Sequence, residues 1–181
     1  MNPALPANPP DSSLLLALER RGAFTDCYAL EIPMPASQAQ FVEAFYTSSL
    51  FRAERFILKV LASEPSTDQY SRDLAQGTKD NFAVWRVAQR TSEQLLLTDQ
   101  TGRTSSWLMA VPDPTCPGAK TKLFIGSAVI GRSNAKTGKQ DFSFVFHALL
   151  GLHDIYSRRL LQAAASKLLA DKRSHTQPTH V

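Results

Sequence analysis

One histidine stands out as a candidate for chemistry because of where it lies in a long helical pattern. His153 falls near the centre of an apolar stripe, one turn from Leu149 and Tyr156. A buried neutral imidazole needs a partner for its N–H, and a ligand oxygen would serve. His153 would then bind a ligand or act as the acid or base of an enzyme. A hydrogen bond to a sheet residue or to water is the other interpretation.

The residue types that hold metals do not cluster in this sequence. His147 and His153 are six residues apart, so they cannot ligate one ion from a single helical face. No HExxH or CxxC motif and no carboxylate-rich loop occurs. Cys27 and Cys116 have no basic helix start beside them, which predicts that neither thiol is catalytic. We therefore expect no metal site and no cofactor.

Two stretches resemble catalytic motifs without meeting their requirements. Ser127 lies in GSAVIG but lacks the glycine two residues before it that a nucleophile elbow needs, and no acid–base partner is evident. In residues 131–140, GRSNAKTGKQ, six residues separate Gly131 from Gly138, and Gln140 stands where a phosphate loop has Ser or Thr. Neither a serine hydrolase of that type nor a P-loop is predicted.

The two tryptophans are candidates for the wall of an apolar pocket. Trp85 and Trp107 fall in separate predicted strands, and large aromatic rings with one N–H often line ligand cavities. They also fill cores, which is the plainer interpretation. The predicted ligand-binding set is Trp85, Trp107, Met109, Phe146, His153 and Tyr156.

The elements that must position these residues follow from the apolar periodicity. A capping box at Ser37 and Gln40 marks the start of one helix, and alternating apolar residues after position 81 mark strands. Sequential strands with short links favour an antiparallel sheet. The predicted strands are 25–32, 82–90, 93–99, 104–111 and 121–130, and the predicted helices are 38–48, 50–62 and 142–172.

Length and composition are typical of one α+β domain. The chain has 181 residues, 43% of them hydrophobic and 20% charged, which excludes a coiled coil or a wholly disordered chain. We expect residues 13–172 to form the domain. Residues 1–12 are rich in proline and are expected to be a disordered arm, and residues 173–181 a frayed polar tail.

Charge and hydropathy bear on compartment and partners. The net charge is +4, and the basic residues concentrate after position 99. They are not interleaved with aromatics as single-strand binders require, so we expect no nucleic-acid partner. No apolar run approaches the ~20 residues of a membrane span. Arg20 and Arg21 follow the apolar run 14–18, the reverse of a signal peptide. We therefore expect a cytoplasmic protein, with its oligomeric state open and a homodimer included.

The order of elements and three segments carry a family resemblance. The segments are GRTSSWLMAV (102–111), KLFIGSAVIG (122–131) and LLGLHDIYSRRLL (149–161). The chain, over residues 24–170, resembles an uncharacterised bacterial family of the START/birch-allergen-like (SRPBCC) superfamily. That resemblance implies a helix-grip fold, in which an antiparallel sheet wraps a long C-terminal helix around an apolar cavity. The superfamily usually has six strands after its paired helices, whereas four are predicted here. Either residues 63–80 hide another strand or the sheet is reduced.

Four functions remain open at this point. The resemblance favours a protein that binds a small apolar ligand, such as a lipid, polyketide or aromatic, between the sheet and the last helix. An enzyme of cyclase, dehydratase or hydrolase type would use the same cavity with His153 as acid or base. A structural or interaction module would have a filled core without a pocket above ~300 Å³. A binder of nucleic acid or anionic membrane would use the basic half and weaken with salt.

Overall fold

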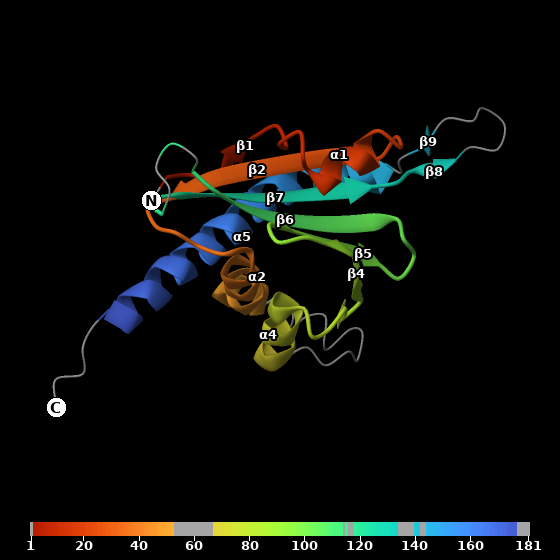
Figure 1. Ribbon diagram of the computed structural model, residues 1–181. Coiled ribbons are helices and arrows are strands. Elements are labelled where there is room, and N and C mark those ends of the chain that lie inside the picture. Colours follow the sequence, from red (N-terminus) through yellow and green to blue (C-terminus); the bar gives the residue numbers. More distant parts are fainter. Residues whose placement is uncertain are drawn as a thin grey trace.

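The protein is an α+β domain with one large antiparallel sheet and a long C-terminal helix packed on it (Figure 1). The computed structural model describes residues 2–52, 67–113, 115, 118–133, 140–141 and 144–176. Within 132–152 and at 175–176 only the backbone is described.

The main sheet has seven strands in the order β1-β2-β7-β6-β5-β4-β3, and every neighbouring pair is antiparallel. Strand β2, which comes early in the sequence, pairs with β7, the last strand of this sheet in chain order. The sheet therefore brings together residues that are far apart in the sequence. A separate two-stranded ribbon joins β8 to β9. The strands are β1 Leu5–Pro6, β2 Phe24–Ile32, β3 Asn81–Phe82, β4 Trp85–Arg90, β5 Gln94–Asp99, β6 Thr104–Pro112, β7 Thr121–Val129, β8 Arg132–Ser133 and β9 Gln140–Asp141.

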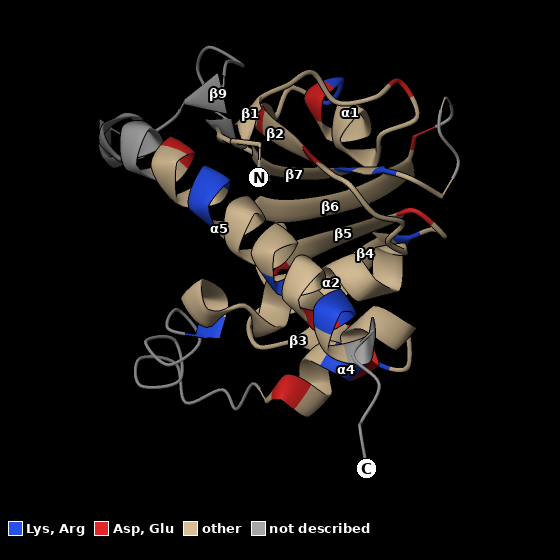
Figure 2. Ribbon diagram, turned by 90° about the vertical axis from the view of Figure 1, so that its left-hand side faces the viewer, with Lys and Arg blue, Asp and Glu red and all other residues tan. Residues whose placement is uncertain are grey.

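Helices cover both faces of the sheet, but unequally. Helix α1 (Leu14–Glu19) lies on one face, whereas α2 (Gln38–Thr47), α4 (Asp68–Gln76) and α5 (Phe144–Thr176) lie on the other (Figure 2). Ser37 and Gln40 form the predicted capping box at the start of α2. Helix α5 crosses β2 and β7 and packs against α2. The prediction of a long final helix on the sheet is confirmed.

Strand alternation divides the buried side chains into two cores. Tyr28, Leu30 and Ile125 belong to the larger core under α2 and α5. Cys27, Phe124 and Trp107 point to the opposite face and pack under α1. Because successive strand residues face opposite sides, neighbouring residues of β2, β6 and β7 serve different cores.

Two sequence-based expectations differ from the structure. Residues 1–12 are expected from the sequence to be a disordered arm, but within them Leu5 and Pro6 pair with Ala29 and Tyr28 at the edge of β2, and Ala4 is buried. An edge strand tolerates proline because the missing N–H would otherwise face solvent. The predicted strand 82–90 is divided by a tight turn at residues 83–84, where Ala83 has a φ of 51°, into the end of β3 and the whole of β4. The two-residue strands β1 and β3 supply the extra sheet positions that the sequence pattern did not reveal.

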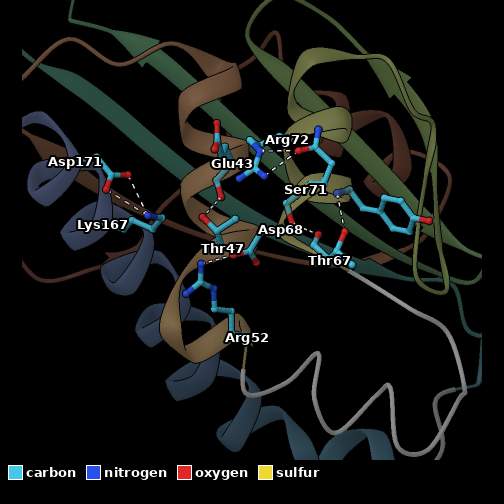
Figure 3. Close-up of polar contacts among 11 residues, drawn as sticks. Glu43, Thr47, Arg52, Thr67, Asp68, Ser71, Arg72, Lys167 and Asp171 are labelled. Atoms are coloured by element: carbon cyan, nitrogen blue, oxygen red, sulfur yellow. Dashed lines mark hydrogen bonds and ion pairs between the residues drawn. The ribbon is translucent and has the colours of Figure 1, made fainter. Parts of the chain in front are cut away.

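Helix α4 occupies part of the polar segment after the predicted helix 50–62. Of that predicted helix, residues 53–62 lie outside the described part of the chain. An ion pair between Arg52 and Asp68 joins the chain that follows α2 to the start of α4 (Figure 3). Thr67 caps α4 through its side chain, which accepts a hydrogen bond from Tyr70 N–H. Helix α2 packs against α4 on one side and against α5 on another.

Candidate functional site

A half-open pocket of about 210 Å³ lies between the sheet and α5. Its floor comes from β6 and β7, its roof from α5, and its side from α2, Phe51 and Trp85. The described residues lining it are Phe45, Tyr46, Phe51, Trp85, Thr104, Ser105, Ser106, Ile125, Gly126, Ser127, His153, Tyr156, Ser157 and Leu160. Most of the wall is apolar or aromatic, and the polar groups are almost all hydroxyls.

The pocket exists because the sheet presents small side chains beneath α5. Ser106 and Ser127 are directly opposite each other on β6 and β7. Two positions along the same strands, the equivalent pair is Leu108 and Ile125. These four residues share one face of the sheet. The change from large to small residues removes side-chain volume from the floor and leaves space against the helix.

Asp26 extends this polar row onto β2, where it pairs in register with Ser127. One carboxylate oxygen, Oδ1, accepts hydrogen bonds from the Ser127 N–H at 2.9 Å and from the Ser127 hydroxyl at 2.7 Å. The other oxygen, Oδ2, lies 3.0 Å from His153 Nε2. The Asp26 side chain is only 14% exposed, so these three contacts use most of its accepting capacity.

His153 joins the pocket roof to this row. Its Nε2 lies 3.1 Å from Ser127 Oγ and 3.4 Å from Ser157 Oγ, in addition to the Asp26 contact. The ring is 40% exposed and lines the pocket. Both interpretations of His153 are compatible with this geometry: Nε2 contacts the sheet residues Asp26 and Ser127, and the ring also faces the space where a ligand would bind.

The two groups shift each other's pKa toward a charged pair. The hydrogen bond to Asp26 raises the pKa of His153 above its ordinary 6.5, against the opposing effect of burial. Burial alone would raise the pKa of Asp26. Hydrogen bonds from His153 and Ser127 outweigh it and hold that pKa below 3.8. Asp26 is therefore a carboxylate at neutral pH, and its contact with His153 favours the protonated form of the imidazole.

This arrangement of serine, histidine and aspartate is not that of a hydrolytic triad. In a triad the aspartate binds Nδ1, and Nε2 is left to accept the serine proton. Here Asp26 approaches Nε2, and the Ser127 hydroxyl donates to Asp26 rather than to His153. Ser127 therefore does have acidic and basic side chains near it, Asp26 and His153, contrary to expectation. Its hydroxyl is nevertheless not placed for activation as a nucleophile.

A second set of polar contacts, made by Asp154, Arg158 and Tyr28, also joins α5 to β2. Arg158 forms an ion pair with Asp154 at 2.9 Å, and its guanidinium lies over the Tyr28 ring at 5.6 Å. Burial, followed by the hydrogen bond to Asp154, raises the pKa of Tyr28. Tyr28 and Asp26 share one face of β2, so α5 is joined to that strand at two successive positions.

The structure separates the predicted ligand-binding residues. Trp85, His153 and Tyr156 line the pocket. Trp107 and Met109 belong to the core under α1, on the opposite face of the sheet. Trp107 is fully buried there, and its indole N–H donates to Gln94 Oε1 at 3.0 Å. The prediction that the two tryptophans face one cavity is therefore wrong. Phe146 lies in α5, with its side chain outside the described residues.

Sequence reasoning missed Asp26, Ser106 and Ser157. One signal was available for Asp26, because it is an acidic residue on the same face of β2 as Tyr28 and Leu30. A carboxylate there must be paired to be buried. No comparable signal marks Ser106, because its neighbours in space depend on strand register.

The described residues contain no group of three or more histidines, cysteines, aspartates or glutamates that could hold a metal ion. Burial, with the nearby Asp26 charge, raises the pKa of the Cys27 thiol to about 12, so this thiol is not activated. Cys116 lies outside the described residues. Among the helices that the structure describes, none has the length and apolar character to cross a membrane. No family model, curated protein or solved structure matches this chain.

Proposed function

We propose that this protein binds a small, largely apolar molecule in the pocket between its sheet and α5. The main support is the pocket floor, where the large pair Leu108 and Ile125 is followed, two positions along the same strands, by the small pair Ser106 and Ser127. Two serines at the centre of a buried sheet face leave space that apolar residues would otherwise fill. A helix-grip architecture of the START/birch-allergen-like superfamily forms part of the proposal, supported by the sheet order and by the position of α5.

The pocket size favours the smallest of the three ligand classes. At about 210 Å³ it is below the ~300–1,000 Å³ of sites for drug-sized ligands. A lipid chain or a polycyclic polyketide needs more room than a single aromatic ring. The rings of Tyr46 and Phe51, whose centroids are 4.8 Å apart and nearly perpendicular, offer edges and faces for such a ring.

The other functions have less support. A filled core would place large side chains at positions 106 and 127. A cavity enzyme that used His153 Nε2 as its acid or base would need this atom to reach the substrate, yet Asp26 and Ser127 already contact it. Of the basic residues after position 99, Lys120 pairs with Glu31 and Lys122 lies over the Phe124 ring. These contacts give the nucleic-acid alternative no added support.

A titration with toluene, a one-ring probe without polar atoms, tests this proposal. We expect saturable shifts of the Trp85 indole signal in NMR spectra of the wild-type protein. Ser106→Leu should fill the pocket floor and abolish these shifts, whereas Ser166→Leu, at an exposed position of α5, should leave them unchanged. Absence of binding to the wild type, or equal binding to Ser106→Leu with its fold retained, would argue for the filled-core module.

A further inference from the structure

We infer that the ligand of this pocket carries an uncharged hydroxyl or carbonyl group, which it places against Ser106 and Ser127. This inference rests on the proposed function and narrows it to a class, a single ring with a neutral polar substituent.

The charges around the pocket are already paired. The Asp26 carboxylate lies behind Ser127, where it accepts two hydrogen bonds from that residue and contacts His153. Asp154 and Arg158 pair with each other and do not line the pocket. Among the described lining residues there is no lysine and no arginine. A ligand carboxylate would therefore meet only an imidazole already committed to Asp26.

A negative ligand would also be repelled by Asp26. Burial of an anion beside a buried carboxylate is unfavourable unless a further cation accompanies it. A cationic ligand meets the opposite difficulty, because Asp26 has most of its accepting positions filled and is 14% exposed. Neither charge has a free counterpart in the described wall.

The hydrogen-bonding groups that remain available to a ligand in the described wall are hydroxyl groups. Within the described residues no hydrogen bond involves the Ser106 hydroxyl, which points to the pocket side of β6. Ser127 donates its proton to Asp26 and keeps lone pairs for accepting. One serine that can donate and another that can accept suit a phenol or alcohol, which does both, or a carbonyl, which accepts from Ser106.

Four ligands that share one methyl-substituted ring test the inference: toluene, p-cresol, p-toluate and 4-methylbenzylamine, each titrated at neutral pH. A net hydrogen bond in a protein corresponds to about a 2- to 10-fold gain in affinity. We therefore expect p-cresol to bind about 2- to 10-fold more tightly than toluene, and the two charged ligands more weakly than toluene. Ser106→Ala and Ser127→Ala should bring the p-cresol to toluene ratio toward one, while Ser166→Ala should preserve it.

The outcomes separate this inference from the proposed function. If p-toluate or 4-methylbenzylamine binds most tightly, the pocket binds ligands but the neutral class is wrong. The same conclusion follows if neither Ser106→Ala nor Ser127→Ala changes the ratio. If none of the four ligands binds the wild-type protein, the proposed function fails together with the inference.

Discussion

The imidazole of His153 and the carboxylate of Asp26 join the C-terminal helix to β2, with Nε2 and Oδ2 3.0 Å apart. The two residues are 127 positions apart in the sequence, and the contact forms only because β2 lies next to β7 beneath α5. His153 lines the pocket, and Asp26 lies behind Ser127 on its floor. The position of the helix over the pocket and the charge beside the pocket therefore depend on the same contact.

The His153–Asp26 pair should make stability depend on pH in a defined direction. Because folding raises the pKa of His153, its contribution is complete below about pH 6.5 and is lost as pH rises through the folded-state pKa. Because folding lowers the pKa of Asp26, that contribution is present above about pH 3.8 and is lost as pH falls through its folded-state pKa.

His153→Gln tests this dependence through chemical denaturation between about pH 5 and pH 9. The variant should unfold about 0.5–1.5 kcal/mol more easily at the acidic end, because solvent screens this partly exposed pair and reduces the ~1.5–3 kcal/mol of a hydrogen bond to a charged group. The difference should shrink toward the alkaline end. The Lys167→Gln variant, in an exposed pair with Asp171 on the same helix, should show no such trend. A difference that stays constant across this range would contradict the pairing.

Asp26→Asn should lower the pKa of His153, measured from the chemical shifts of the imidazole protons. The carboxylate acts through both a hydrogen bond and its charge. Asp154→Asn is the matched comparison, because Asp154 raises the same pKa through its charge alone. The shift caused by Asp26→Asn should be the larger. Equal shifts for the two variants would mean that the hydrogen bond to Asp26 is not formed in solution.

Gly126→Ala should destabilise the protein, because this glycine lets α1 approach the sheet. A Cβ at this position would lie 2.6 Å from Leu15 Cδ2 and 2.7 Å from the Asp26 backbone oxygen. The backbone of a central strand cannot move aside, so we expect a loss of about 1–3 kcal/mol in the free energy of unfolding. A variant as stable as the wild type would show that Leu15 and the β2 backbone do not approach Gly126 this closely.

The two tryptophans should report differently on ligand binding, because only Trp85 lines the pocket. In Trp107→Phe the remaining indole is Trp85, and p-cresol should change its fluorescence. In Trp85→Phe the remaining indole is Trp107, buried on the other face of the sheet, and its emission should not respond. A response from Trp107 alone would place the ligand under α1 instead.

The sequence carried enough information for the layers of this fold but not for its site. The capping box at Ser37 and Gln40 and the apolar stripe around His153 are local patterns, and both predicted their elements. The edge strands β1 and β3 have two residues each, too few for an alternating pattern. Ser106 and Ser127 become a pocket floor only through strand register, which no local pattern specifies.

The face of the sheet on which Trp107 lies also could not be predicted from local patterns. The sequence shows which residues of β6 share a face with Trp107, but not which of the two faces α5 covers. Trp85 and Trp107 lie on strands separated by β5, so their relative orientation depends on the registers of two strand pairs and on the bulge between Val87 and Gln89. The larger core under α2 and α5 includes Trp85 at its margin.

A crystal structure of the protein soaked with p-cresol would show directly whether the pocket between the sheet and α5 binds a neutral one-ring ligand. We predict electron density for one ring between Trp85 and Leu160, with its oxygen within hydrogen-bond distance of Ser106 or Ser127. The hollow of about 590 Å³ beside Glu43 and Leu168 serves as an internal comparison, because it is larger and lies outside the sheet–helix pocket. Density only in that hollow, or an empty pocket at saturating p-cresol, would show that the pocket between the sheet and α5 is not the ligand site.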